Sequence, residues 1–168
     1  MTLAAQFAGD VQVSGTLTPA RINLPPGSVT AGAVSGGPGQ YLPATNQGQQ
    51  YQPEYKQASG ATAAADQQVV HVTRGASAVL IDFVVGAVVA NIGAAIVTFD
   101  LWKNGSSVLS APIVLTSATA AYALAGATIT TASSVAGDVF EVKVTVAASS
   151  GTLAKGAFAR LCIREDPN

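Results

Sequence analysis

The sequence predicts an all-β fold, a jelly-roll-like β-sandwich with an extended N-terminal arm or short fibre segment. Hydrophobic residues make up 49% of the chain and charged residues only 10%, whereas charged residues are about 25% of an ordinary globular domain. The chain is rich in Ala, Val, Gly, Thr and Ser, which is typical of strands and turns rather than helical bundles. Two local patterns, at Asn104-Gly105 and at residues 139–146, support the same fold.

Residues 1–65 are expected to form the arm. They hold four charged residues and six of the eight prolines, and each proline fixes φ and removes a backbone donor. Gly9 to Pro19 alternates apolar and polar residues, as in a short strand or hairpin, and Pro25-Pro26-Gly27 favours an extended run followed by a turn. We expect this arm to become ordered by contact with other subunits; a disordered tail is the alternative.

Residues 66–168 predict about eight strands, which form the sandwich. Asn104-Gly105 separates two apolar runs, and a type I′ hairpin turn needs positive φ at both of its central residues. Residues 139–146 alternate strictly, with Phe140, Val142 and Val144 on one face. The last strand repeats that alternation, and a short helix at 118–125 is an alternative to one weak strand. The expected strands cover residues 69–74, 79–85, 95–103, 107–110, 113–115, 120–124, 127–131, 139–146 and 155–164.

Phe83 to Phe99 is the one candidate membrane span, because it is almost uncharged and as long as the shortest spanning helices. It is rich in Val and Ile, contains Gly86 and Asn91, and has no close Lys or Arg anchor. Two buried strands joined by a turn fit this stretch better. The start of the chain has no signal-peptide pattern, and the single cysteine, Cys162, fits folding in a reducing cytoplasm.

The charge pattern argues against nucleic-acid binding and favours self-association. The formal net charge is −1, and the eight basic residues are scattered singly, whereas a nucleic-acid surface needs clustered Lys and Arg. A weakly charged, nearly neutral surface promotes association. We therefore expect a closed oligomer and no nucleic-acid partner.

No catalytic, metal or cofactor motif is recognisable. His71 is the only histidine and is expected to be an ordinary strand residue, because a general base needs an oriented nucleophile and a carboxylate. One His and one Cys do not make a zinc centre. Glu165-Asp166 is expected to be a solvated end. Trp102 is expected to pack in the core or an interface rather than to stack on a sugar, and Tyr41, Tyr51 and Tyr55 suit subunit interfaces.

Two sets of residues carry a resemblance to tailed-bacteriophage capsid decoration proteins, also called cement or head-fibre proteins. Gly9-Asp10-Val11-Gln12-Val13-Ser14-Gly15-Thr16-Leu17-Thr18-Pro19 with Leu24-Pro25-Pro26-Gly27-Ser28-Val29-Thr30 resembles their N-terminal part. Val69 to Ala76, Asp100 to Ser110 and Gly137-Asp138-Val139 resemble their distal domains. The motifs are short, and no catalytic residues come with them.

The resemblance implies a homotrimer that is made in the host cytoplasm and lies on the outer capsid surface of the virion. The arm, residues 1–65, would bind the major capsid protein, and residues 66–168 would trimerise and project outward. The expected attachment residues are the apolar side chains of the arm, Val11, Val13, Leu17, Ile22, Leu24 and Val29.

Three other functions compete with this interpretation. The first is a phage fibre or tail domain that binds a host receptor or a host-surface glycan, for which the same sandwich would serve. The second is a secreted bacterial adhesion or matrix domain, against which the missing signal peptide argues. An enzyme is the least favoured, because one histidine and scattered acids leave little to assemble.

Overall fold

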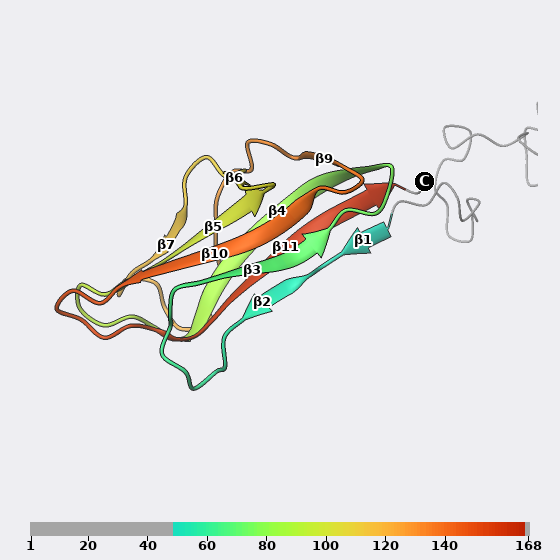
Figure 1. Cartoon of the computed structure of the whole chain (residues 1–168). Helices are drawn as coiled ribbons and strands as arrows, with labels where there is room; N and C mark the ends of the chain where they lie inside the picture. Colours follow the sequence, from blue (N-terminus) through green and yellow to red (C-terminus); the bar gives the residue numbers. More distant parts are fainter. Residues whose placement is uncertain (1–48, 167–168) are drawn as a thin grey trace, which may run out of the picture. The chain divides into compact units, whose positions relative to one another are not determined.

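The computed structural model describes residues 49–166, which belong to one of the two units into which the chain divides, Leu42–Asn168. Every regular element in this range is a β-strand, and all strand pairs are antiparallel (Figure 1). The predicted all-β sandwich of two sheets is confirmed, while the jelly-roll assignment stays a prediction. Between residues 49 and 166, no helix is long and apolar enough to span a bilayer.

One sheet, called sheet A here, is built on the two longest strands, β4 (Ser77–Val89) and β11 (Lys155–Asp166). These strands pair with each other along nearly their full lengths. Two short strands pair with the other edge of β11, and two more pair with the other edge of β4. The four short strands are β1 (Gln49–Tyr51), β2 (Glu54–Lys56), β8 (Ala125–Gly126) and β9 (Ser133–Val135).

The second sheet, sheet B, has β10 (Val139–Ala147) at its centre, between β3 (Asp66–Val72) and β5 (Ile96–Lys103). The short strands β6 (Ser106–Ser107) and β7 (Ile113–Leu115) pair with the outer edge of β5. The connections β3–β4, β4–β5 and β10–β11 each pass from one sheet to the other. Residues distant in the sequence therefore meet across the sandwich.

The core lies between the sheets and follows the period-two patterns of the sequence. In β10, Phe140, Val142 and Val144 are buried, while Glu141, Lys143 and Thr145 face outward. The same alternation holds in β11, as predicted. Burying one large apolar side chain contributes about 1.5–3 kcal/mol, so the alternation fixes which face of each strand points inward. The core is completed by Tyr55, Phe83, Val85, Val97, Phe99, Leu101, Leu115, Leu161 and Ile163.

The predicted turns around the two sheets are also present. Asn104 and Gly105 have φ values of 51° and 82°, as a type I′ turn requires, and they join β5 to β6. The stretch from Phe83 to Phe99 forms the end of β4, a turn and the start of β5. It is therefore part of both sheets.

Two expected strands are wrong. Residues 120–124 form a turn and loop, and the short strand β8 follows at 125–126. Tyr122 has a φ of 61°, which is incompatible with an extended strand. Residues 127–131 contribute only an isolated bridge between Ile129 and Leu109, and the next strand is β9. Small Ala and Thr side chains bury too little surface there to fix a long strand.

The sandwich begins before residue 66. Strands β1 and β2 lie in the segment assigned to the arm, and both pair with β11. These strands are three residues each and are rich in Gln, Glu and Lys. No alternation of apolar and polar residues therefore predicts them. Their partner β11 supplies the pairing that their own sequence does not predict.

Candidate functional site

A groove of about 640 Å³ lies on the outer face of sheet A. Its floor is apolar and is formed by Val84 and Val88 of β4 and Phe158 of β11. Strand β2 and residues 57–59 form one side, and Leu124 stands on the other. This volume is in the range of ligand and peptide sites, which are typically mainly apolar with a few polar groups.

Two glycines allow the groove to form. A Cβ atom at Gly86 would lie 2.6 Å from Cζ of Phe158 and 3.0 Å from the carbonyl oxygen of Ala123. Gly86 therefore lets the Phe158 ring and the 122–124 loop approach the backbone of β4. Gly156 has a φ of 59°, and a Cβ there would lie 2.8 Å from both Ser59 and Val88. Only glycine permits that backbone conformation at such a close approach.

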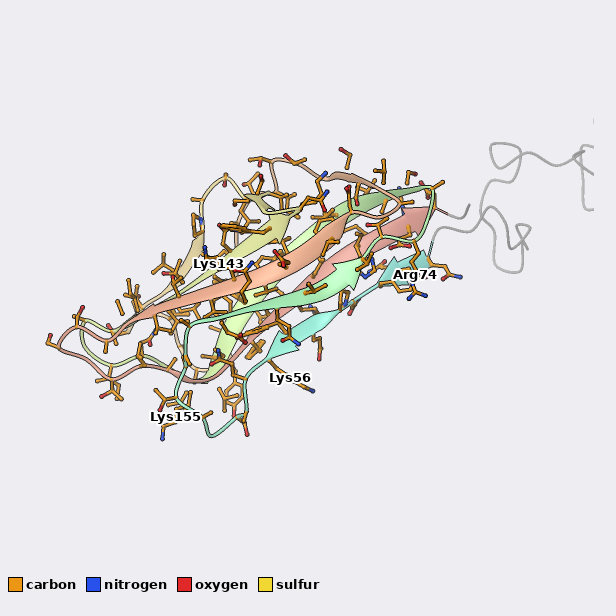
Figure 2. The ribbon with its side chains drawn as sticks, in the orientation of Figure 1. Lys56, Arg74, Lys143 and Lys155 are labelled. Atoms are coloured by element: carbon orange, nitrogen blue, oxygen red, sulfur yellow. The ribbon has the colours of Figure 1, made fainter. Side chains whose placement is uncertain are left out.

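Charged side chains of both signs surround this apolar floor. Glu54 and Arg160 are opposite each other in the β2–β11 pairing. Lys56, which is labelled in Figure 2, lies two residues after Glu54 on β2. Asp82 does not line the groove but lies further along β4, opposite Cys162 in the β4–β11 pairing. Among the described residues, these four charges form no ion pair with each other or with another side chain.

The apolar surface of sheet A continues beyond the groove. A bulge in the β4–β11 pairing lies next to Ile81, whose side chain is 51% exposed. Val79 and Val135 are also exposed on this sheet, at 38% and 59%. The outer face of sheet A thus combines exposed aliphatic side chains with charges that have no ion-pair partner in the described range.

The outer face of sheet B has a different character, because its polar groups satisfy one another. The indole N–H of Trp102 donates to Asp100 at 2.7 Å, and Ser107 donates to the other oxygen of that carboxylate. The Lys143 ammonium lies 4.1 Å from the centre of the Trp102 ring, as a cation–π contact requires, and Figure 2 shows Lys143 on this sheet. Gln67 donates to Glu141 nearby.

This arrangement excludes the core position that was one of the two expectations for Trp102, leaves its expected place in an interface as a prediction, and bears on glycan binding. The side chain is only partly buried and lies on the outer face of sheet B rather than in the core. One face of its ring is already covered by Lys143. A sugar that stacked on that face would first have to displace the ammonium group.

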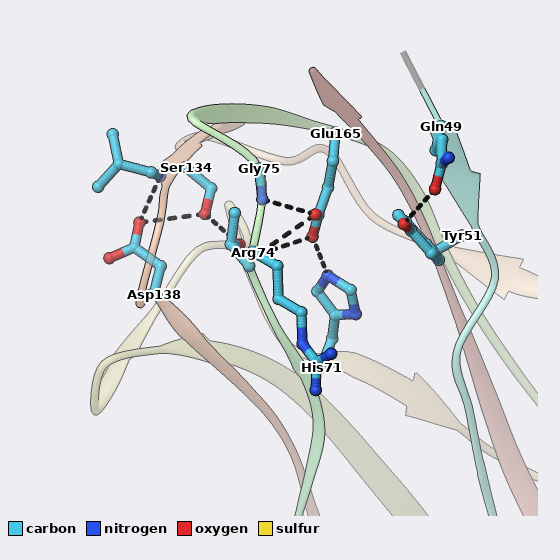
Figure 3. Close-up of polar contacts among 10 residues, drawn as sticks. Gln49, Tyr51, His71, Arg74, Gly75, Ser134, Asp138 and Glu165 are labelled. Atoms are coloured by element: carbon cyan, nitrogen blue, oxygen red, sulfur yellow. Dashed lines mark hydrogen bonds and ion pairs between the residues drawn. The ribbon is translucent and has the colours of Figure 1, made fainter. Parts of the chain in front are cut away.

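A polar cluster joins the two sheets at the end of the sandwich where β1 begins (Figure 3). The His71 Nε2 atom lies 2.6 Å from Oε1 of Glu165. The same carboxylate accepts hydrogen bonds from the backbone N–H groups of Gly75 at 2.9 Å and Arg74 at 3.2 Å. Glu165 is only 5% exposed, so the expectation that it forms a solvated end is wrong. Its burial is tolerated because donors surround it.

The electrostatics of this cluster favour a charged Glu165. Burial alone would raise the pKa of its carboxyl group, but the hydrogen bonds from Gly75, His71 and Arg74 outweigh that effect and hold the pKa below its usual value. A carboxylate only accepts hydrogen bonds, so the Nε2 atom of His71 carries the proton. The Tyr51 ring lies against the imidazole, with ring centres 5.7 Å apart.

A second polar network supports the β9–β10 turn beside that cluster. The Asp138 carboxylate accepts hydrogen bonds from Val135 N–H, from the Asn104 side-chain amide and from the Ser134 hydroxyl. These contacts, with the backbone N–H of Val135 first, hold its pKa below the usual value. Ser134 also bonds Thr73 at 2.8 Å. The Ser134 hydroxyl is thus engaged by Asp138 and Thr73, whereas the His71 imidazole bonds Glu165.

No buried side-chain nitrogen or oxygen within residues 49–166 lacks a hydrogen-bond partner. In the same range, no three His, Cys, Asp or Glu side chains gather where they could hold a metal ion. The buried polar side chains of this range thus have partners, and the groove on sheet A is the candidate functional site.

The predicted site residues fall into two groups. The six expected attachment residues and Tyr41 lie outside the described residues. Tyr51 is 39% exposed on β1, so its ring has surface available to a partner. Tyr55 is 1% exposed, and its hydroxyl contacts Asp66 and Gln57. The structure thus places Tyr55 in the core of its own sandwich, which corrects its assignment to a subunit interface.

Sequence reasoning missed the groove because its lining comes from four separate segments. Val84 and Val88 differ by four positions and Phe158 is on another strand, so no local motif joins them. The alternation in β11 was predicted, but the face that carries Phe158 was not assigned to solvent. A large aromatic residue on the outer face of a strand was the one available signal.

No protein-family model matches this chain, and no curated protein sequence does. Among solved structures, the chain is similar to one described as the structure of infectious bursal disease virus Gt strain, with a TM-score of 0.30 and 10% sequence identity. That match covers 81% of this chain and 42% of the other. This chain thus spans less than half of the length of the chain it matches, and a likeness at this level carries no argument about function.

Proposed function

We propose that this chain is a non-enzymatic structural protein of a virion, which acts by association rather than by chemistry. The observation that carries the proposal is the outer face of sheet A, with its apolar groove and its charges that form no ion pair within the described range. Monomeric soluble proteins rarely expose large contiguous apolar patches unless these bind a partner. Within residues 49–166, the hydrogen bond of the His71 side chain goes to Glu165 and not to a serine, threonine or cysteine side chain, which supports a role without nucleophilic catalysis.

More specifically, we propose that the chain is a tailed-phage capsid decoration protein. A homotrimer would bind the outer surface of the capsid through the major capsid protein, after synthesis in the host cytoplasm, without contacting nucleic acid or membrane. The N-terminal arm would attach, and the sandwich would trimerise and face solvent. The support for this form is the sequence resemblance together with the low net charge of −1.

Attachment by the arm is tested by deleting residues 1–48 and measuring co-sedimentation with purified capsids. The deletion stops at residue 48 because β1, β2 and the buried Tyr55 belong to the sandwich. The expected result is a folded β-protein, judged by circular dichroism, that no longer sediments with capsids. Capsid binding equal to that of the full chain would refute attachment by the arm.

The alternative, a receptor- or glycan-binding fibre domain, has a partner on the host surface. Tyr51 and Tyr122, at 39% and 69% exposure, and the partly exposed Trp102 are described aromatic rings that favour it. The Lys143 contact on the Trp102 ring disfavours it. Binding of the full chain to a glycan array, without binding to capsids, would make this alternative the better description.

A further inference from the structure

We propose that the groove-bearing face of sheet A is the contact surface for a second copy of this chain. The proposal deepens the proposed function, on which it rests, by naming the surface through which the copies associate. The contact surface consists of the groove floor at Val84, Val88 and Phe158 and of the adjacent loop residues Tyr122 and Leu124.

The contrast between the two outer faces selects sheet A. On sheet B, Trp102, Asp100 and Lys143 engage one another, and the exposed apolar residues Val69, Val72 and Val114 do not line a groove as large as the one on sheet A. On sheet A, Leu124 is 56% exposed beside an apolar floor. Its contact with a second copy would remove apolar surface from water, which favours association.

Tyr122 supplies an independent observation in the loop beside the groove. It has a φ of 61°, which is a rare conformation for a bulky residue and costs free energy. Its backbone N–H donates to the carbonyl oxygen of Ala87, which ties the loop to β4. The side chain is nevertheless 69% exposed. The unfavourable backbone conformation of Tyr122 and the exposure of its ring are both explained if the ring packs against a partner.

The charges on this face favour a second copy over a partner of a single charge sign. Glu54 and Asp82 are acidic, whereas Lys56 and Arg160 are basic, and none forms an ion pair within residues 49–166. A surface with both signs can place an acid of one copy against a base of the next copy, as a closed ring of three chains requires. The net charge of −1 adds little long-range repulsion between copies.

The test is the solution mass of the full-length protein, measured by light scattering after gel filtration. Leu124→Glu introduces a charge into the contact at an exposed position. Tyr122→Gly removes the ring and suits a positive φ, so it does not threaten the fold. The matched control is Val114→Glu, because Val114 is 45% exposed on the outer face of sheet B. Circular dichroism and thermal unfolding check that each variant is folded.

The wild-type protein and Val114→Glu are expected to have the mass of several chains, three if the trimer is correct, and both groove variants the mass of one. Folded groove variants that keep the wild-type mass would overturn this proposal and leave the proposed function intact. If those variants also lost capsid binding, the groove would instead seat the capsid protein. A wild-type mass of one chain would overturn both self-association and the trimer of the proposed function.

Discussion

His71 and Glu165 form a 2.6 Å contact between the two sheets, although 94 positions separate them in the sequence. His71 lies on β3, the edge strand of sheet B, and Glu165 lies near the end of β11 in sheet A. The backbone N–H groups of Arg74 and Gly75 donate to the same carboxylate. The buried carboxylate of Glu165 thus ties the β3–β4 corner to β11.

Glu165→Gln is expected to destabilise the sandwich. The amide replaces one acceptor oxygen with an NH₂ group, which turns a donor towards the N–H groups of Gly75 and Arg74. Leaving buried donors unsatisfied costs about 1–3 kcal/mol, so the free energy of unfolding should fall by about that amount. The measurement is unfolding by urea at neutral pH.

The control for this variant is Glu141→Gln on the outer face of sheet B. Glu141 accepts a hydrogen bond from Gln67 but faces solvent, and such surface substitutions usually change stability by less than about 0.5 kcal/mol. Equal effects of the two variants would show that the buried position of Glu165 does not matter for stability.

Stability should also decline in acid, because the carboxyl groups of Glu165 and Asp138 have lowered pKa values in the folded protein. A carboxyl group whose pKa is lower in the folded protein stabilises the fold at pH values above its pKa in the unfolded protein. That unfolded pKa is 4.5 for Glu165 and 3.8 for Asp138. That contribution is lost as the pH falls through the folded value. The thermal midpoint should therefore drop as the pH falls below about 4.5.

The double variant Glu165→Gln, Asp138→Asn provides the comparison for this acid effect. It lacks both titrating groups, so its thermal midpoint should change less with pH over the same interval, from a lower starting value. A midpoint that falls as steeply as in the wild-type protein would assign the acid sensitivity to other carboxyl groups.

The sequence predicted the elements that a local pattern determines. Phe140, Val142 and Val144 alternate with polar residues, and burial of one face is sufficient to orient that strand. Asn104-Gly105 is equally local, since the turn type depends on the φ values of these two residues. Such features need no knowledge of the partner strand.

The features that sequence reasoning missed depend on partners that are distant in the chain. Strand β1 is exposed at every position and exists because β11 offers a free edge. Glu165 looked like a solvated end because His71 and Gly75, which bury and bond it, precede it by about 90 positions. The groove likewise requires the β4–β11 pairing before its floor exists.

Tyr55 should make the protein sensitive to alkali. Burial of the phenol, with smaller effects from its neighbours Gln57 and Asp66, raises its pKa from 10.0 to about 12. A raised pKa contributes stability that is fully present below 10.0 and is lost as the pH rises through about 12. The free energy of unfolding should therefore decrease above pH 10.0.

Tyr55→Phe removes this sensitivity while keeping the ring in the core. The variant should lose about 1 kcal/mol at neutral pH, because its hydroxyl contacts with Asp66 and Gln57 are absent. Its unfolding free energy should then vary less with pH in alkali. Tyr122→Phe is the control, since that side chain is 69% exposed. An alkaline decline that persists unchanged in Tyr55→Phe would assign the effect to another group.

Gly86→Ala should deform the groove from its floor. The new methyl group would lie 2.6 Å from the Phe158 ring and 3.0 Å from the carbonyl oxygen of Ala123, so the ring and the loop that carries Leu124 must shift. Overpacking of this kind typically costs about 1–3 kcal/mol.

Gly60→Ala is the matched control, because nothing lies within 4 Å of a Cβ at Gly60. Gly86→Ala should lower the thermal midpoint and weaken self-association measured by dilution in light scattering, whereas Gly60→Ala should change neither. Unaltered stability and mass in Gly86→Ala would mean that the Phe158 ring moves freely, and the groove floor would then not be a preformed surface.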